Sequence, residues 1–446
     1  MAKTAANAPE MQVAIPPMTD AERANLLGHL QTAIEIELST IPIYLYTYYS
    51  IIRVPENTDD LPNGDELATF ANKAGALIMS VAVEEMLHMS LACNIMRALG
   101  GTPKIYCKSP GNYPTNLPHH KKGFSVGLSP LSSDQMVLFL EIEKPEANDA
   151  PPQENNWDTI GQFYDYIKDF IIRKTTDADF MPTKKDPDSE KSQLGDGRGY
   201  YSANNVDTIY PKNAYYIKQP LDPYDPVERG ASQAQYPNNK DSGSLKTVKD
   251  KASALEAINI IMHQGEGYPD TDHKEDDYQK DEETHWYKYN ELYKKLKGFT
   301  AADMSIMVFN FPDNPTRNSY PTKFHPIVDL ANAVYSYLFL MTEASYKLTD
   351  EAQASMFYIG MHKGMIFILD KIIGGMRYLQ TGNTAGQALA PTFENYQFNS
   401  LATAKAELVQ LCVSVPASLN LDSNILLRIQ DLPDVNVGPD NFVHFN

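Results

Sequence analysis

The chain has 446 residues, 42% of them hydrophobic, which is enough for a large buried core and for two or three domains. Its 38 basic and 57 acidic residues give a formal charge of −19, so nonspecific binding to nucleic acid or to an anionic membrane is unfavourable. The three cysteines lie far apart and form no CxxC pair, which argues against a disulfide framework and against thiolate metal sites.

The sequence contains no recognisable targeting or membrane segment. Its N-terminus lacks the continuous apolar stretch of a signal peptide, and no apolar run is long enough to cross a bilayer. We therefore expect a cytoplasmic protein without membrane or nucleic-acid partners. A homo-oligomer remains open.

A first helix is predicted to begin at Thr19, where T-D-A-E can form a capping box. Glu37 falls in the apolar stripe of this helix and should face the core, whereas Glu35 lies on another face. Pro42 has no N–H for the Leu38 carbonyl, so a kink is expected beside Glu37. The apolar stripe comprises Leu27, Leu30, Ile34, Ile41, Tyr44 and Tyr48.

A second helix is predicted over residues 66–99 and ends at Gly100 and Gly101, a strong stop signal. Both Glu85 and His88 belong to the stripe of this helix that should face inward. The other members of the stripe are Ile78, Ala92, Ile95 and Leu99.

The rest of the chain is predicted to be mainly helical. Residues 102–248 are rich in Pro, Asn, Asp and Tyr and indicate a long, loop-rich crossover. Further helices are expected at 134–143, 158–172, 253–264, 281–296, 326–347 and 351–379. We thus expect a flexible N-terminus at 1–18, a helical bundle at 19–300 that includes the insertion at about 102–248, and a helical C-terminal region at 301–446 packed on the bundle.

The chain contains two Glu-x-x-His motifs, Glu85 to His88 and Glu282 to His285. Residues three apart on a helix share a face, so this spacing can present a carboxylate and an imidazole to one metal ion. Bundle proteins with di-iron or di-manganese sites combine two such motifs with single glutamates from two other helices. One chance occurrence is unsurprising in a chain this long, so the surroundings of each motif must decide.

The surroundings favour a metal-ligand role most strongly for Glu85 and His88. Both lie among Met and Leu residues on an apolar helix face, where an unpaired carboxylate would cost several kcal/mol. A structural hydrogen-bonded pair is the alternative interpretation. Glu37 supports the same argument from the first helix, with a capping or salt-bridging role as its alternative.

Three further residues are weaker candidates for metal ligands. Glu266 sits between two glycines at a helix end, where small neighbours allow close approach, although a turn alone would explain the glycines. Glu282 and His285 stand in a run, K-D-E-E-T-H-W-Y-K-Y, that otherwise indicates a solvated charged face.

Other chemistries have little support in the sequence. There is no G-x-S-x-G elbow, P-loop or dinucleotide fingerprint. Carboxylate and imidazole ligands without thiolates favour iron, with two ions expected, although manganese or zinc remains open. The tyrosines at 44, 46, 48 and 49 could line a redox pocket, but aromatic residues at helical spacing are more often core.

Several segments resemble a known family. The chain is similar to the ferritin-like family of iminophenyl-pyruvate dimer synthases, relatives of the imine-coupling enzymes of violacein and indolocarbazole biosynthesis. The similar segments are A-I-E-I-E-L-S-T-I-P-I-Y-L at 33–45, V-E-E-M-L-H-M at 83–89, N-I-M-R-A-L-G-G-T-P at 94–103, T-I-G-Q-F-Y at 159–164, S-A-L-E-A-I-N-I-I-M-H-Q-G-E-G at 253–267 and A-P-T-F-E at 390–394.

The resemblance implies a ferritin-like four-helix bundle and a metal-dependent oxidative function. Its metal-contacting set would be Glu37, Glu85, His88, Glu266 and His285. The chain departs from the family at Gln162, where the family tends to have Glu; if that position binds metal, one carboxylate is lost.

Three functions follow as hypotheses. The leading one is a di-iron oxidoreductase that uses O2 or peroxide on a small organic substrate, with an amino-acid-derived substrate as one option. The alternatives are a ferroxidase or iron-handling protein, and a non-catalytic binding or structural protein on a ferritin-like scaffold.

Overall fold

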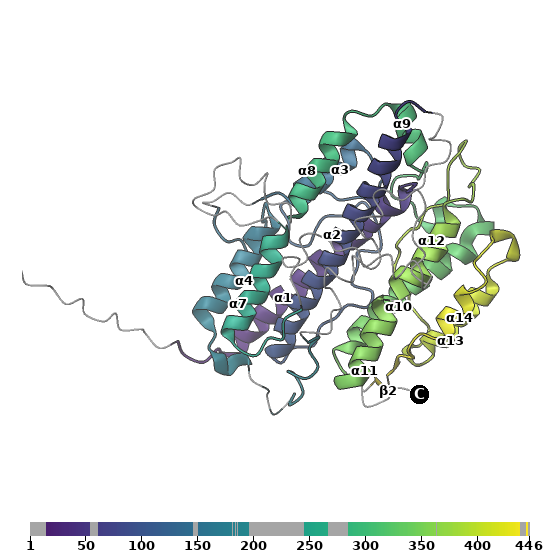
Figure 1. The fold of residues 1–446 in the computed structure, drawn as a ribbon. Coiled ribbons are helices and arrows are strands. Elements are labelled where there is room, and N and C mark those ends of the chain that lie inside the picture. The colour runs from purple at the N-terminus through teal and green to yellow at the C-terminus, as the bar shows by residue number, and fades with distance from the viewer. Residues whose placement is uncertain are drawn as a thin grey trace, which may run out of the picture.

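The computed structural model describes residues 15–53, 61–145, 150–180, 182, 184, 186–195, 245–265, 284–362, 364–437 and 443–444. The regular secondary structure of these residues is almost entirely helical, which confirms the predicted fold class (Figure 1). The first part contains α1 (Asp20–Ser50), α2 (Gly64–Ala98), α3 (Ser133–Ile142), α4 (Ile160–Lys174), the 3₁₀ turn η1 (Asp177–Phe180), α7 (Lys251–Gly265), α8 (His285–Leu296) and α9 (Ala301–Met307).

The second part is also helical apart from one short pair of strands. It contains η3 (Arg317–Ser319), η4 (Thr322–Phe324), α10 (His325–Ser345), α11 (Asp350–Ala354), the π-helical segments η5 (Ser355–His362) and η6 (Gly364–Leu369), α12 (Asp370–Met376), η7 (Leu401–Thr403), α13 (Ala404–Ser414), η8 (Ala417–Leu419) and α14 (Ile425–Gln430). The strands β1 (Asn436–Val437) and β2 (Val443–His444) pair antiparallel.

Four helices close a ring in one half of the bundle. Helix α1 packs along α2, α4 contacts α1, α7 contacts α2, and α4 and α7 contact each other. In the other half, α3 packs against α8, which also contacts α2. Figure 1 shows α4 with α7 beside one half of the long helices and α3 with α8 beside the other half. Two positions of the bundle are therefore each filled by two short helices, whose ends lie inside the bundle.

Helix α1 begins as its sequence predicts and passes through Pro42 without a break. The capping box joins Thr19 and Glu22, and the helix continues to Ser50. Since Pro42 cannot donate to the Leu38 carbonyl, that carbonyl accepts from Ser109 Oγ at 3.2 Å instead. A side chain of the crossover thus satisfies the backbone group that proline leaves without a helical donor.

Helix α2 is buried on nearly every side. It is long and apolar enough, by length and composition alone, to span a membrane, so the expectation that no apolar stretch is long enough was wrong. That expectation relied on unbroken apolar runs, whereas α2 mixes its apolar residues with small and polar ones. In this structure 94% of its apolar window is buried inside the protein.

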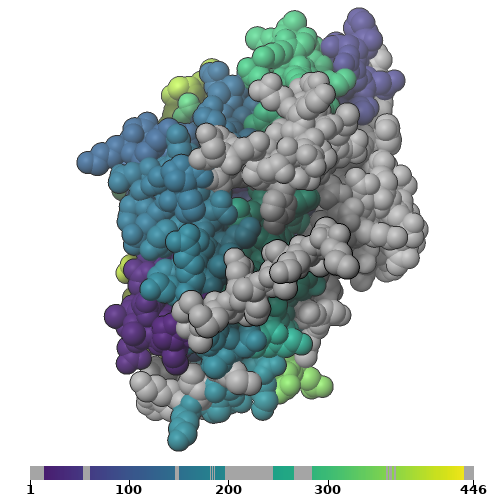
Figure 2. All heavy atoms as spheres, turned by 90° about the vertical axis from the view of Figure 1, so that its left-hand side faces the viewer, coloured from purple at the N-terminus to yellow at the C-terminus, as the bar shows by residue number. Residues whose placement is uncertain are grey.

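Helix α10 and the segments after it cover the opposite face of the α1 and α2 pair (Figure 1). Ile41, Leu45 and Met86 of the long helices meet Leu338 of α10 and Met365 of η6 around a small apolar cavity. The long helices are therefore enclosed between the C-terminal helices and the short helices of the bundle. In the view of Figure 2, blue-to-teal residues of the crossover occupy one side, with the purple N-terminal end of α1 below them.

The helix predicted over 351–379 is present but is π-helical in its middle. It consists of α11, two π-helical segments and α12, and it ends at Met376. Two glycines in the π-helical stretch lie close to α10: an added Cβ would lie 2.7 Å from Met341 Sδ at Gly360 and 2.4 Å from Leu338 Cδ2 at Gly364. Close packing of these glycines on α10 is a tertiary effect that helical periodicity does not reveal.

The glycines after α2 yield a test of how this helix ends. Gly100 has φ of +79°, and the N–H groups of Gly100 and Gly101 bind the carbonyls of Arg97 and Met96, as in a Schellman motif. Gly100→Ala should lower the free energy of unfolding by about 1–2 kcal/mol, because a Cβ is strained at positive φ. Urea denaturation measures the effect.

Gly374→Ala is the matched control. Gly374 lies inside α12 and an added Cβ would meet nothing within 4 Å. Alanine there should leave the protein as stable or stabilise it by up to about 1 kcal/mol. Equal effects of the two substitutions would contradict the assigned role of Gly100.

Candidate metal centre

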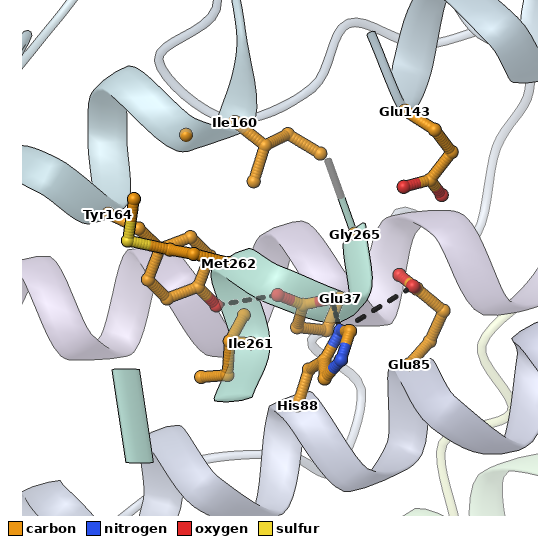
Figure 3. A pocket seen from close by; sticks show the side chains of 10 residues that line it. Glu37, Glu85, His88, Glu143, Ile160, Tyr164, Ile261, Met262 and Gly265 are labelled. Atoms are coloured by element: carbon orange, nitrogen blue, oxygen red, sulfur yellow. Dashed lines mark hydrogen bonds and ion pairs between the residues drawn. The ribbon is translucent and has the colours of Figure 1, made fainter. Parts of the chain in front are cut away.

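Glu37, Glu85 and His88 converge in the middle of the bundle, as their positions on the apolar stripes predict. The three side chains are at most 3% exposed. His88 Nδ1 lies 3.7 Å from Glu85 Oε1 and 3.9 Å from Glu37 Oε2. Figure 3 shows the three side chains pointing toward one another. Their ligand atoms lie within 4.8 Å of one another, so they could hold one metal ion.

A second group shares Glu85 with the first. His285 Nδ1 lies 3.0 Å from Glu85 Oε1 and 3.3 Å from Glu143 Oε2. Glu85, Glu143 and His285 are all buried and also satisfy the distances of a metal-binding group. In Figure 3, Glu143 approaches Glu85 from the side opposite α2. Glu85 therefore belongs to two overlapping groups, an arrangement suited to a pair of metal ions.

A hydroxyl group anchors one oxygen of each of the three carboxylates. Thr40 donates to Glu85 Oε2 at 2.6 Å, and Tyr164 donates to Glu37 Oε1 at 2.5 Å. The Tyr44 hydroxyl donates to Glu143 Oε1. In each case the other oxygen faces a histidine, so the side chains are held in place while one ligand atom stays available.

The two histidine rings stack with centroids 5.3 Å apart, but their hydrogen bonding differs. His88 Nε2 lies 3.0 Å from Gln264 Oε1. Neither ring nitrogen of His285 makes an aligned hydrogen bond, although Glu84 Oε2 lies 3.1 Å from Nε2 and the ring is 0% exposed. A buried imidazole without an aligned partner is costly, and a metal ion at Nδ1 would satisfy it. This donor set of carboxylates and imidazoles fits iron, manganese or zinc.

Burial and neighbouring charges raise the pKa values of some residues of the site and lower those of others. Burial raises the pKa of Glu37 well above its usual value and also raises that of Glu143. Burial acts on Glu85 in the same way, but His285 and His88 outweigh it and hold the pKa of Glu85 at about 2.

The pKa values of the two histidines also shift in opposite directions. Burial lowers the pKa of His88 to about 4. Burial alone would also lower the pKa of His285, but the surrounding Glu143, Glu84 and Glu85 raise it well above its usual value. Without metal, the cluster therefore favours a cationic His285 beside an anionic Glu85 and a proton on Glu37, while Glu143 takes up a proton more readily than a free carboxyl group.

The residues that contact the histidines from outside form a second layer. Lys288 donates to Glu84 Oε2, and both side chains are about one-tenth exposed. This pair lowers the pKa of Glu84, which burial alone would raise, to about 2. Glu84 therefore presents a charged carboxylate to His285, whereas Gln264 presents a neutral amide to His88.

The structure brings together four of the six predicted site residues, namely Glu37, Glu85, His88 and His285. Glu266 and Glu282 lie outside the described residues. The nearest described neighbours of Glu266 are at the site: Gln264 contacts His88, and Gly265 lines the cavity described below.

The sequence interpretation of His285 was wrong in two respects. The predicted helix from residue 281 begins only at His285, because Thr284 is the N-cap with extended backbone and accepts from the Tyr287 N–H. The helical i, i+3 argument therefore does not apply to the second motif. Nor is the described part of this run, residues 284–289, a solvated face, since His285 and Tyr289 are both fully buried.

Glu143 was missed by the sequence analysis. It is the C-cap of α3 and is 3% exposed. It follows Met136 and Phe139 at spacings of seven and four residues, and both of these are buried. An acidic residue continuing an apolar stripe was thus a usable signal, the same one that identified Glu37.

Gln162 does not occupy a ligand position. It is N3 of α4 and forms a capping box with Thr159. Its Oε1 accepts from the backbone N–H of Asp158 at 2.8 Å, and its Nε2 donates to the Pro151 carbonyl. Glu and Gln both serve at this position of a capping box. The expectation that Gln162 could mark a lost ligand therefore has no support.

The tyrosines of α1 divide between the site and the core. Tyr44 contacts Glu143 and lies 5.4 Å from Tyr289 between ring centroids. Tyr46 instead donates to the Pro312 carbonyl, and Tyr48 and Tyr49 pack against each other. Of these four tyrosines, Tyr44 is the one that we place at the candidate metal centre, through its hydrogen bond to Glu143.

A small cavity borders the His88 side of the centre. Its volume is about 20 Å³, room for about one water molecule. Figure 3 shows Ile160 and Tyr164 of α4 and Met262 of α7 around it. Its full lining is Glu37, Glu85, His88, Glu143, Ile160, Gly161, Tyr164, Ile261, Met262 and Gly265.

Comparison with known proteins agrees with this architecture. The ferritin-like family model matches residues 30–294, more than half of the chain, and the chain belongs to that family. A solved ferritin-like protein from Caulobacter vibrioides is similar at 18% identity and a TM-score of 0.47, covering 79% of this chain and 96% of that one. No curated protein matches the chain.

The buried Lys288–Glu84 pair should stabilise the metal-free protein. Lys288→Met would remove one of the two cationic groups that face the buried Glu84, leaving His285, and should lower the free energy of unfolding by about 1–3 kcal/mol. Urea denaturation of metal-free protein measures this change.

Lys294→Met is the control on the same helix. Lys294 pairs with Glu291, but the two side chains are 50% and 35% exposed. Its loss should change stability by less than about 1 kcal/mol. Comparable losses for the two variants would show that Glu84 is not held by Lys288.

Proposed function

We propose that the chain is a dinuclear metal protein, with iron as its metal, and that it catalyses oxidation with O2 or peroxide. The observation that carries the proposal is the sharing of Glu85 by two buried groups, one with Glu37 and His88 and the other with Glu143 and His285. Helix-bundle proteins of the ferritin-like kind place two metal ions among such glutamates and histidines.

The chain's own residues would prepare the site for this chemistry. Thr40, Tyr164 and Tyr44 donate hydrogen bonds to the three carboxylates. Gln264 contacts the outer nitrogen of His88, and the Glu84 carboxylate lies 3.1 Å from the outer nitrogen of His285. Two bound iron ions would supply the redox capacity that these side chains lack. The fully buried position of the cluster keeps bulk water away from it.

The resemblance to iminophenyl-pyruvate dimer synthases supports a small organic, amino-acid-derived substrate. The supporting segments include the two that contribute Glu37, Glu85 and His88 to the centre. In this proposal the substrate reacts at the side of the centre where α4 and α7 border the cavity.

Ferroxidase activity is the second candidate, and the size of the cavity favours it. A space of about 20 Å³ admits O2, peroxide or water rather than an organic molecule. Supplying Fe²⁺ in excess under air separates the two candidates. Many turnovers of Fe²⁺ to Fe³⁺ per chain with growth of a mineral core support the ferroxidase, whereas oxidation limited to two ions per chain supports an oxidase of another substrate.

Metal analysis tests the shared-ligand arrangement directly. After anaerobic dialysis against Fe²⁺, the protein should retain two ions per chain by elemental mass spectrometry. Glu85→Ala should lose both ions because both groups use Glu85, while Glu37→Ala and Glu143→Ala should each lose one.

Glu35→Ala is the control on the same helix. Glu35 lies two residues from Glu37 but contacts Gln31 and Lys108 and is 31% exposed. This variant should keep two ions. A folded protein that retains no iron would contradict the proposed function.

Metal uptake should also depend on pH. The pKa values of Glu37 and His285, raised well above their usual values, mean that metal-free protein holds protons on groups that must lose them to bind metal. Affinity should therefore fall as the pH falls from 8 to 6, with release of protons on binding. Calorimetry in two buffers of different ionisation enthalpy counts these protons, and uptake without proton release would contradict the assigned ligands.

A further inference from the structure

The two histidines of the centre point the same nitrogen inward. Nδ1 of His88 faces Glu37 and Glu85, and Nδ1 of His285 faces Glu85 and Glu143. The rings stack at an interplanar angle of 23°. Because Nδ1 faces the carboxylates in both histidines, the two metal positions differ in what contacts the outer nitrogen, Nε2.

The outer nitrogen of His285 faces a charged group. Glu84 Oε2 lies 3.1 Å from His285 Nε2, and Lys288 holds that carboxylate in place. A carboxylate behind an imidazole fixes the ring orientation and makes the other nitrogen a stronger metal donor, typically by 10–100-fold in affinity. Glu84 is itself buried, so solvent does not screen this effect.

The outer nitrogen of His88 faces a neutral group. Gln264 Oε1 lies 3.0 Å from His88 Nε2 and fixes the ring without adding a charge. His88 also lines the cavity between α4 and α7, as does Glu37. His285 and Glu84 do not line this cavity, although Glu85 and Glu143 of the His285 group do, so the His285 position meets the cavity through its carboxylates and not through its imidazole.

We propose that the two metal positions are unequal: the His285 position is closed and binds its ion first and more tightly, and the His88 position is the open one. This inference rests on the proposed function. Glu84 is the positioning residue that creates the difference, and the open position is where a water-sized reactant arrives and where metal exchanges. A metal position that retains access for a reactant is the usual catalytic one.

The order of filling can be observed with Co²⁺ alone. Calorimetric titration of metal-free protein should show two steps, with the first tighter by at least 10-fold. In crystals with one equivalent of Co²⁺, anomalous scattering at the cobalt edge should appear beside His285 and not beside His88. Two ions binding in one step, or a first ion beside His88, would overturn the inference.

Variants of the outer layer test its cause. Because Glu84→Gln alone leaves Lys288 without its partner, the double variant Glu84→Gln with Lys288→Met removes both charges together. It should weaken the tight step by 10–100-fold and leave the second step within about 3-fold. Gln264→Glu is the reciprocal variant and should strengthen the second step.

The outcomes separate the inference from the proposed function. Circular dichroism first confirms that each variant is folded. An unchanged tight step in the double variant, or equal weakening of both steps, would overturn the role of Glu84 while two bound ions still support a dinuclear centre. Wild-type protein that binds no Co²⁺ and no Fe²⁺ would contradict the dinuclear centre itself.

Discussion

Burial of Glu85 is the constraint on which the rest of the site depends. A carboxylate in a helical core requires compensating partners, and Glu85 obtains them from Thr40, His88 and His285. His285 in turn contacts Glu143 and Glu84, and Glu84 pairs with Lys288. One buried charge thus organises a network that spans α1, α2, α3 and α8, and this network is suited to two metal ions.

The interrupted helices explain how such a network fits inside a bundle. Glu143 ends α3, His285 begins α8, and Gln264 lies at the end of α7. Helix ends bring backbone and side chains close to the centre from directions that a continuous helix does not offer. The long helices α1 and α2 form one side of the centre, and the C-terminal helices that pack on them shield them from water.

The two sides of the centre are built for different tasks. The His285 side is closed and charged, whereas the His88 side meets a cavity lined by apolar residues of α4 and α7. This division agrees with oxidation chemistry, in which a metal ion must be retained while a small reactant enters. Whether the protein oxidises an organic substrate or Fe²⁺ then depends on which of these molecules can reach the His88 side of the centre.

The sequence alone determined the helices and half of the centre. Periodicity and capping signals placed Glu37, Glu85 and His88 on buried faces, because local spacing decides which side of a helix a residue occupies. The stripe of Met136 and Phe139 could have indicated that Glu143 is buried, but its meeting with Glu85 and the setting of His285 depended on tertiary structure. Glu143 and His285 both lie at helix ends, where a side chain's direction follows from the packing of distant segments, and no local pattern reports that Glu84 supports His285. The interpretation of Gln162 was corrected by a local interaction, the capping box that it forms with Thr159 at the start of α4.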